Sequence, residues 1–184
     1  MTAQFSDQVN YRGKSYSIAG KNGGGLFDPA AHGLKPVGKC SACWRGFVCT
    51  YAVDDRHLLL DSLTVWLDDP ATPLFGVPPR PEEGGFNIYQ RQSRGHSETT
   101  NGFYAVYEGL AHRVPYTGGL LLAADFIEEL YVHMGFHPAW KYREVHELVF
   151  RDGMLVQESD RSPQIAEFRR ELGQAKRPWW RFWG

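Results

Sequence analysis

The alternation of apolar and polar positions is clearest from Cys40 to Leu63, in the run CSACWRGFVCTYAVDDRHLLLDSL. Residues Phe47 to Val53 have period-two character and are rich in β-branched and aromatic types, which is typical of a strand. The turn formers DDRH follow, and an apolar run from Leu58 to Trp66 returns. Asp61 and Ser62 interrupt that run and indicate a bulge or an exposed face. We therefore predict a β-hairpin.

A second hairpin is predicted from Trp140 to Val156, in the run WKYREVHELVFRDGMLV. Asp152-Gly153 separates two apolar runs there, which is a strong short-range signal for a hairpin turn. Both segments read as Trp, apolar strand, Asp-containing turn and apolar strand, so residues 40–66 and 140–157 form a possible loose internal repeat. A smaller hairpin is expected within residues 1–20, because Gly13 can adopt the positive φ of a tight turn.

The run from Leu120 to Met134, LLLAADFIEELYVHM, has helical spacing. Its apolar residues at 122, 126, 127, 130 and 134 fall on one face of a helix, and its acidic residues fall on another. Gly135 and Pro138 follow, as they do after many helix ends. These features predict a mid-chain helix, with a strand as the alternative because Tyr131-Val132 favours β-structure.

A second helix is predicted near the C-terminus. Ser162 can cap it, Pro163 fits its first position, and an apolar stripe follows at Ile165, Phe168 and Leu172. Together these elements predict an α+β fold, mainly antiparallel β-hairpins with a mid-chain helix and a C-terminal helix packed on the sheet. Residues 1–175 would form a single domain, followed by a Trp/Arg-rich tail at 176–184.

Composition narrows the functional classes. The chain has 184 residues, of which 14% are aromatic, and this favours strands and a core filled with large rings. The net charge of −1 lacks the basic footprint of a nucleic-acid-binding protein. Three cysteines do not suggest a disulfide framework, and the start MTAQFSDQVNYRGK does not resemble a signal peptide. No apolar run is long enough to cross a bilayer, so we expect a cytoplasmic protein.

Residues 67–102 form a long irregular loop, because five prolines and several glycines interrupt them. This loop and the first hairpin carry a local excess of acidic residues, which can attract a basic partner. Trp66 and Tyr89 are candidate anchors, and ordinary solvated loop charge is the alternative interpretation. The predicted partner-binding residues are Asp54, Asp55, Trp66, Asp68, Asp69, Glu82, Glu83 and Tyr89.

Cysteines and histidines provide one weak metal pattern. Cys40-x-x-Cys43 has the spacing of half a zinc site, and His133 and His137 could supply the other half if the pairs met in space. A lone C-x-x-C is common, so we expect no metal or other cofactor and keep these four residues as candidates. No known catalytic motif is present. A small hydrolase-type enzyme would need His133, His137 or His146 in a cleft with a strongly shifted pKa.

The tail RPWWRFW mixes cations with indole rings. Its residues Trp179, Trp180 and Trp183 could contact a membrane surface, nucleobases or a pocket in another protein. The alternative is that the tail folds back and covers its own sheet.

The segments CWRGFVCTYAVDDRHLLLDSL and FHPAWKYREVHELVFRDGMLV, with LFDP upstream, resemble a group of small uncharacterised bacterial proteins. In that group a W-R-G-[FY] motif precedes a strand-turn-strand unit, and no catalytic residue can be carried over from it. We expect the Trp44 ring to pack and the Arg45 guanidinium to bind loop carbonyls.

In its acidic, mostly β character the chain is also similar in style to immunity proteins of polymorphic toxin systems. Our hypothesis is a non-enzymatic bacterial binding protein, an immunity protein that neutralises a cognate toxin by occluding its active site. The alternatives are the hydrolase and a membrane-surface or nucleic-acid accessory protein that uses the tail.

Overall fold

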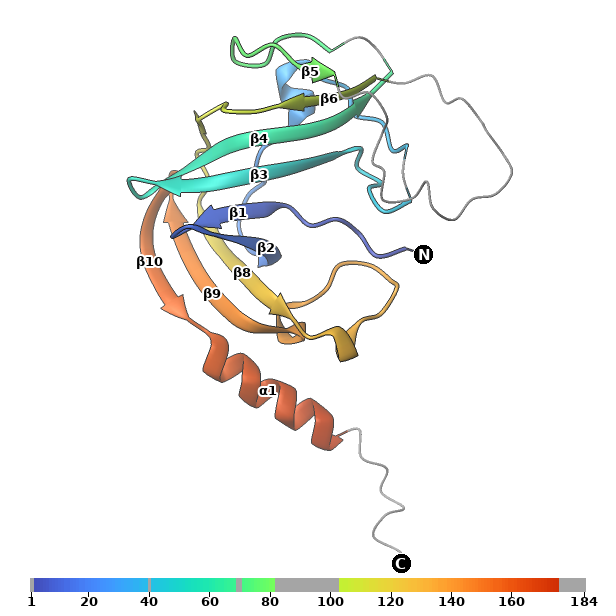
Figure 1. The fold of residues 1–184 in the computed structure, drawn as a ribbon. Helices are drawn as coiled ribbons and strands as arrows, with labels where there is room; N and C mark the ends of the chain where they lie inside the picture. The colour runs from blue at the N-terminus through green and yellow to red at the C-terminus, as the bar shows by residue number, and fades with distance from the viewer. Residues whose placement is uncertain (1, 40, 69–70, 82–102, 176–184) are drawn as a thin grey trace, which may run out of the picture.

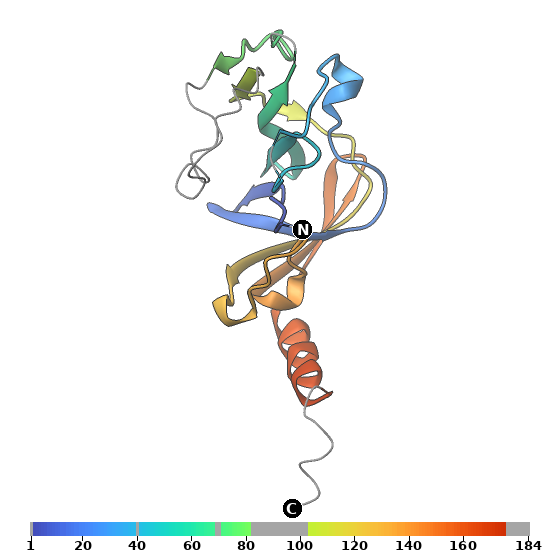
Figure 2. The ribbon, with the colours of Figure 1, turned by 90° about the vertical axis from the view of Figure 1, so that its right-hand side faces the viewer.

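The computed structural model describes residues 2–39, 41–68, 71–81 and 103–175. These residues form one curved sheet of ten strands, from which a C-terminal helix projects (Figure 1, Figure 2). The strands are β1 (Gln8–Tyr11), β2 (Lys14–Lys21), β3 (Phe47–Asp54), β4 (His57–Leu67), β5 (Arg80–Pro81), β6 (Phe103–Tyr107), β7 (His112–Arg113), β8 (Gly118–Phe126), β9 (Tyr142–Arg151) and β10 (Met154–Asp160). The helices are the short 3-10 segments η1 (Pro29–His32), η2 (Glu128–Leu130) and η3 (Ala139–Lys141), and the α-helix α1 (Ser162–Ala175).

The strand order is β10-β9-β8-β2-β1-β3-β4-β6-β5, and β7 also pairs with β4. The β1–β3 pair is parallel, and every other pair of strands is antiparallel. The sheet bends so strongly that β10 also meets β4, where Met154 lies opposite His57. Inward-facing side chains such as Tyr51, Leu60 and Leu148 are fully buried and form one apolar core inside the bend.

Both predicted long hairpins are confirmed, and their turns contact each other. Asp55 and Arg56 have φ values of 43° and 62°, as a tight turn that matches the twist of its strands requires. At the turn of the other hairpin, the N–H of Leu155 donates to the Arg56 carbonyl at 2.7 Å. The N–H of Leu58 donates to the Gly153 carbonyl at 2.8 Å. The two hydrogen bonds therefore join equivalent positions of the two hairpins, as in an arrangement with a local two-fold axis. The internal repeat itself stays a prediction.

The predicted mid-chain helix is wrong, and so is the α+β fold class. Gly118–Phe126 form strand β8, and within the described residues α1 is the only α-helix, so the fold is mainly β. The reason is that both faces of β8 are covered. Leu120 and Leu122 face the inner core, whereas Ala123 belongs to a second cluster on the opposite face. A strand covered on both faces carries consecutive apolar residues, so the period-two signal is lost.

The predicted C-terminal helix is present; it begins against the outer face of the sheet and then projects away from it (Figure 1), and Phe168 of its predicted apolar stripe is exposed. Ile165 contacts a buried cluster that includes Tyr142 and Val145 of β9. Ser162 bonds differently from our expectation, because its hydroxyl accepts the N–H of Val145 at 3.0 Å. The Asp160 carboxylate instead accepts the N–H of Ser162 at 2.9 Å. α1 has 14 residues, and the described part of the chain holds no helix with the length and apolar character to cross a membrane.

Candidate functional site

The Trp-Arg-Gly motif before β3 is a β-turn that sends its two large side chains in different directions. The N–H of Gly46 donates to the Cys43 carbonyl at 3.1 Å, so Trp44 and Arg45 are the central residues of the turn. Gly46 has a φ of 74°, and a Cβ there would lie 2.5 Å from the Val37 carbonyl oxygen, so the turn requires glycine. The Trp44 side chain is 61% exposed, which shows that our expectation of a packed ring is wrong.

Arg45 turns inward and binds a carboxylate instead of the expected loop carbonyls. Its Nη1 donates to Asp7 Oδ2 at 2.8 Å, and its Nη2 donates to Asp7 Oδ1. Asp7 Oδ1 also accepts the N–H of Cys49 at 2.7 Å, and the Asp7 side chain is only 10% exposed. The bidentate, charge-assisted contact between Arg45 and Asp7 fixes the turn to the segment before β1, and the bond from Cys49 connects the same carboxylate to β3.

The N-terminal segment Thr2–Phe5 lies between this turn and the loop that follows η2, on the right of Figure 1. The main-chain N–H of Gln4 donates to the Gly135 carbonyl at 2.8 Å. Its side chain reaches the other way, because Nε2 donates to the Ser41 carbonyl at 2.8 Å and Oε1 accepts the N–H of Trp44 at 3.3 Å. Gln4 therefore connects two segments that are distant in sequence.

An apolar groove of about 320 Å³ opens between these segments, and we call it the Trp44 groove. Trp44, Met134 and Phe136 are 61%, 51% and 58% exposed. Five of the nine exposed large hydrophobic side chains among the described residues are Trp44 and members of the run Tyr131–Phe136. Such clustering marks a binding surface more often than scattered exposure does. The groove is lined by Gln4, Phe5, Cys43, Trp44, Arg45, Met134, Gly135 and Phe136.

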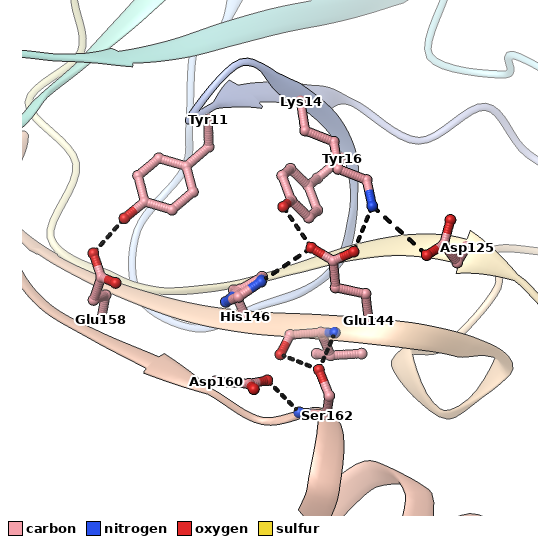
Figure 3. Close-up of polar contacts among 10 residues, drawn as sticks. Tyr11, Lys14, Tyr16, Asp125, Glu144, His146, Glu158, Asp160 and Ser162 are labelled. Carbon is pink, nitrogen blue, oxygen red and sulfur yellow. Dashed lines mark hydrogen bonds and ion pairs between the residues drawn. The ribbon is translucent and has the colours of Figure 1, made fainter.

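A group of polar side chains links the β1–β2 hairpin to β9 (Figure 3). Glu144 accepts hydrogen bonds from Lys14 Nζ and, at 2.6 Å, from the Tyr16 hydroxyl, and His146 Nε2 lies 3.2 Å from the same carboxylate. Lys14, Tyr16 and His146 together hold the pKa of Glu144 at about 2. Burial and the neighbouring Glu144 raise the pKa of Tyr16 to about 12. Glu144 is therefore ionised and Tyr16 protonated at neutral pH.

The same hairpin is also tied to β10. The Tyr11 hydroxyl donates to Glu158, and Arg12 Nη2 donates to the same carboxylate at 2.8 Å (Figure 3 shows the Tyr11 contact). We call the whole group the polar clasp; it consists of Tyr11, Arg12, Lys14, Tyr16, Glu144, His146 and Glu158. Its polar groups bond to one another, so we interpret the polar clasp as a structural link and not as a binding site.

The structure does not gather the predicted acidic residues that it describes. Asp54 and Asp55 lie at the β3–β4 turn, whereas Asp68 follows the far end of β4, an 11-residue strand. Asp68 forms an ion pair with Lys39 at 2.8 Å. Trp66 is only 8% exposed. The remaining predicted contact residues, Asp69, Glu82, Glu83 and Tyr89, lie outside the described residues, as do Trp179, Trp180 and Trp183 of the tail.

The candidate metal ligands that the structure describes, Cys43, His133 and His137, have other partners. Cys43 is buried and its Sγ donates to the Phe47 carbonyl at 3.3 Å, while Cys40 lies outside the described residues. His133 Nδ1 lies 2.8 Å from the Tyr131 hydroxyl. In the described ranges, no three histidine, cysteine, aspartate or glutamate side chains are placed to hold a metal ion.

Of the three histidines considered for catalysis, His133 and His137 both lie beside the Tyr131 ring, and His146 lies on β9. His137 Nδ1 lies 3.3 Å from Lys141 Nζ, and burial together with Lys141 lowers the pKa of His137. His146 belongs to the polar clasp, and none of the three lines the Trp44 groove.

Sequence reasoning missed Phe5, Met134 and Phe136. The signal for Met134 was the apolar run beyond β8, which had been included in the predicted helix from Leu120 to Met134, whereas Phe5 and Phe136 lie outside that run. Comparison of the chain with protein-family models, curated proteins and solved structures gave no match.

Proposed function

We propose that this protein is a non-enzymatic binding protein that holds a partner protein in the Trp44 groove. The observation that carries the proposal is the group of exposed Trp44, Met134 and Phe136 side chains around one apolar groove. Aromatic side chains and methionine are enriched at the centres of protein interfaces, where a few large residues supply most of the binding energy.

The walls of the groove support this proposal because hydrogen bonds hold them in place before any partner arrives. Gln4 joins the Trp44 turn to Gly135, and the Asp7–Arg45 pair fixes the base of the turn. Preformed walls reduce the conformational entropy that is lost on binding.

The chemistry of the lining favours binding over catalysis. Among the described residues, the eight that line the groove include no histidine, aspartate or glutamate, which are the usual general acids and bases. Its thiol, on Cys43, is buried and donates to a main-chain carbonyl. Arg45 is engaged by Asp7.

In its most concrete form, the proposal is that of an immunity protein in the bacterial cytoplasm, with a cognate toxin as partner. This form rests on the likeness in style to immunity proteins and on the near-neutral charge, which gives no reason to expect nucleic acid binding. Asp54 and Asp55 at the β3–β4 turn would then provide a second contact with basic groups on the toxin, and Asp68 at the far end of β4 would provide a separate one.

The test is capture of a partner from the native host by the tagged protein, followed by titration of the purified pair. Trp44→Ala and Phe136→Ala should each weaken binding about 30-fold, as loss of an interface anchor does. Phe168→Ala is the matched control, because Phe168 is 46% exposed on α1 and does not line the groove. Equal affinity of all four proteins would refute a role for the groove.

Growth experiments separate the immunity form from the general proposal. The captured protein should stop growth when it is expressed alone, and co-expression of the wild-type chain should restore growth. Co-expression of the Trp44→Ala variant should fail to restore it. A harmless partner would exclude the immunity form and leave the binding function standing.

A further inference from the structure

A second cavity borders the Trp44 groove. This cavity measures about 270 Å³, and it shares Arg45 and Phe136 with the groove. We call it the Lys21 pocket. Its lining is completed by Ser6, Asp7, Ile18, Ala19, Gly20, Lys21 and Leu26. A ligand that lies along both cavities would therefore meet the apolar groove and then a mostly apolar pocket that also contains the charged residues Asp7 and Lys21.

The charges of the Lys21 pocket do not balance. Asp7 is the only acidic residue among the described residues that line it, and both oxygens of that carboxylate are already bound by Arg45. Lys21 is exposed at the end of β2, and within the described ranges no carboxylate forms an ion pair with it. The pocket thus carries one positive charge in excess, which complements a carboxylate.

The backbone beside the pocket is open on one side. β1 pairs with β2 only as far as Ser17, and one further bond joins the N–H of Ile18 to the Asp7 carbonyl at 2.8 Å. β8 covers the other edge of β2 as far as Lys21. Among the described residues, no strand lies beside the β1-side edge of Ala19–Lys21. An open strand edge is a site where an extended peptide can be added to a sheet.

We propose that the occupant of these two cavities is an extended segment of a partner protein, in which a large apolar side chain lies near an acidic residue. The apolar side chain fills the Trp44 groove, the carboxylate binds Lys21, and the backbone between them lies beside the open edge of β2. This inference rests on the proposed binding function and adds the chemistry of the partner to it.

Short synthetic peptides with one Phe and one Asp at varied spacing provide the test, with binding measured by changes in amide NMR shifts. The best Asp peptide should bind about fivefold more tightly than the same peptide with Lys in place of Asp. In the Lys21→Glu variant this preference should reverse. Lys35→Glu is the control, because Lys35 is exposed, lines neither cavity and changes the net charge equally. A preference that does not reverse, or one that also reverses in the control, would overturn the proposal.

Further outcomes separate this inference from the proposed function. If Trp44→Ala weakens capture of the natural partner while Lys21→Glu leaves it unchanged, the binding function stands and the acidic-segment inference fails. If Trp44→Ala also leaves capture unchanged, both fail. Self-association of the wild type that Trp44→Ala abolishes would identify a second copy of the chain as the occupant. Equally tight binding of the Phe peptide without Asp would reduce the site to an apolar pocket.

Discussion

Replacement of Glu144 by glutamine is the most direct probe of how the polar clasp stabilises the sheet. The change keeps the size of the side chain and removes its charge. Glu144 offers one oxygen to Lys14 and the other to Tyr16, and glutamine keeps only one of these two acceptors. The lowering of the Glu144 pKa from 4.5 to about 2 corresponds to roughly 3 kcal/mol in favour of the ionised form in the folded protein. Because the side chain is 28% exposed, solvent screening reduces the expected loss to about 2 kcal/mol.

The stabilisation by Glu144 should decrease as the pH falls. The folded-state pKa of Glu144 lies below the unfolded value, so its stabilisation is complete above about pH 4.5 and is lost as the pH falls towards 2. The difference in unfolding free energy between wild type and Glu144→Gln should therefore be about 2 kcal/mol at pH 7, and at pH 3 it should fall to less than half of that value.

Urea unfolding of both proteins at the two pH values measures this difference, and the melting temperature at pH 7 should fall by about 4–8 °C. Asp125→Asn is the matched control, since Asp125 contacts the same Lys14 at 3.6 Å but is 58% exposed. Its loss should cost less than about 0.5 kcal/mol. A Glu144→Gln variant as stable as the wild type, or a deficit that does not change with pH, would refute the electrostatic account of the polar clasp.

Two further predictions concern the base of the Trp44 turn. Asp7→Asn should lower the free energy of unfolding by about 2 kcal/mol, because it leaves the half-buried Arg45 guanidinium without its charged partner, and a variant with wild-type urea stability would contradict this. Burial, assisted by Asp7, raises the pKa of Cys49 to about 12, so iodoacetamide at pH 8 should spare this thiol in the native protein and modify it in urea. Peptide mapping by mass spectrometry decides the second prediction, and native-state labelling at the rate of a free thiol would show that it is wrong.

Sequence reasoning succeeded where the structural signal is local. The Asp152-Gly153 dipeptide specifies a tight turn through its own backbone preferences, and both residues have the positive φ that such a turn needs. Asp61 and Ser62 were predicted to mark a bulge or an exposed face, and the β3–β4 register does shift there: Thr50 pairs with Ser62, and Tyr51 pairs with Leu60. Neither feature depends on distant residues.

The prediction of a mid-chain helix was wrong because the apolar pattern of this segment arises from contacts with residues distant in sequence. Consecutive apolar residues in β8 reflect a core on one face and α1 with η3 on the other. No window of sequence shows that a second layer will cover a strand. The surroundings of the segment after β8 are also set by distant residues, since Met134 and Phe136 are exposed beside Phe5, which is far away in sequence.

The exposure of Trp44 also depends on segments that are distant in sequence. A tryptophan at the start of a strand is usually buried, and the sequence offered no reason to expect otherwise. Its exposure comes from a close backbone approach between Gly46 and Val37 and from the N-terminal segment, which occupies the adjacent space. The Trp44 groove forms only where the Trp44 turn, the N-terminal segment and the loop after η2 meet. It could therefore not be predicted from any one of these segments.

The structure separates the residues that hold the fold from those that would hold a partner. Trp44 and Phe136 are more than half exposed, so removal of their rings leaves no cavity in the core, whereas truncation of a buried aromatic residue costs about 3–5 kcal/mol. Trp44→Ala should therefore reduce binding without a comparable loss of stability. Gln4 belongs to both groups, because it bonds to the two walls of the groove and to nothing in the inner core. The turn at Gly46 and the hydrogen bonds of Gln4 hold the Trp44 side chain exposed to solvent. An exposed tryptophan held in this way is suited to contact another molecule.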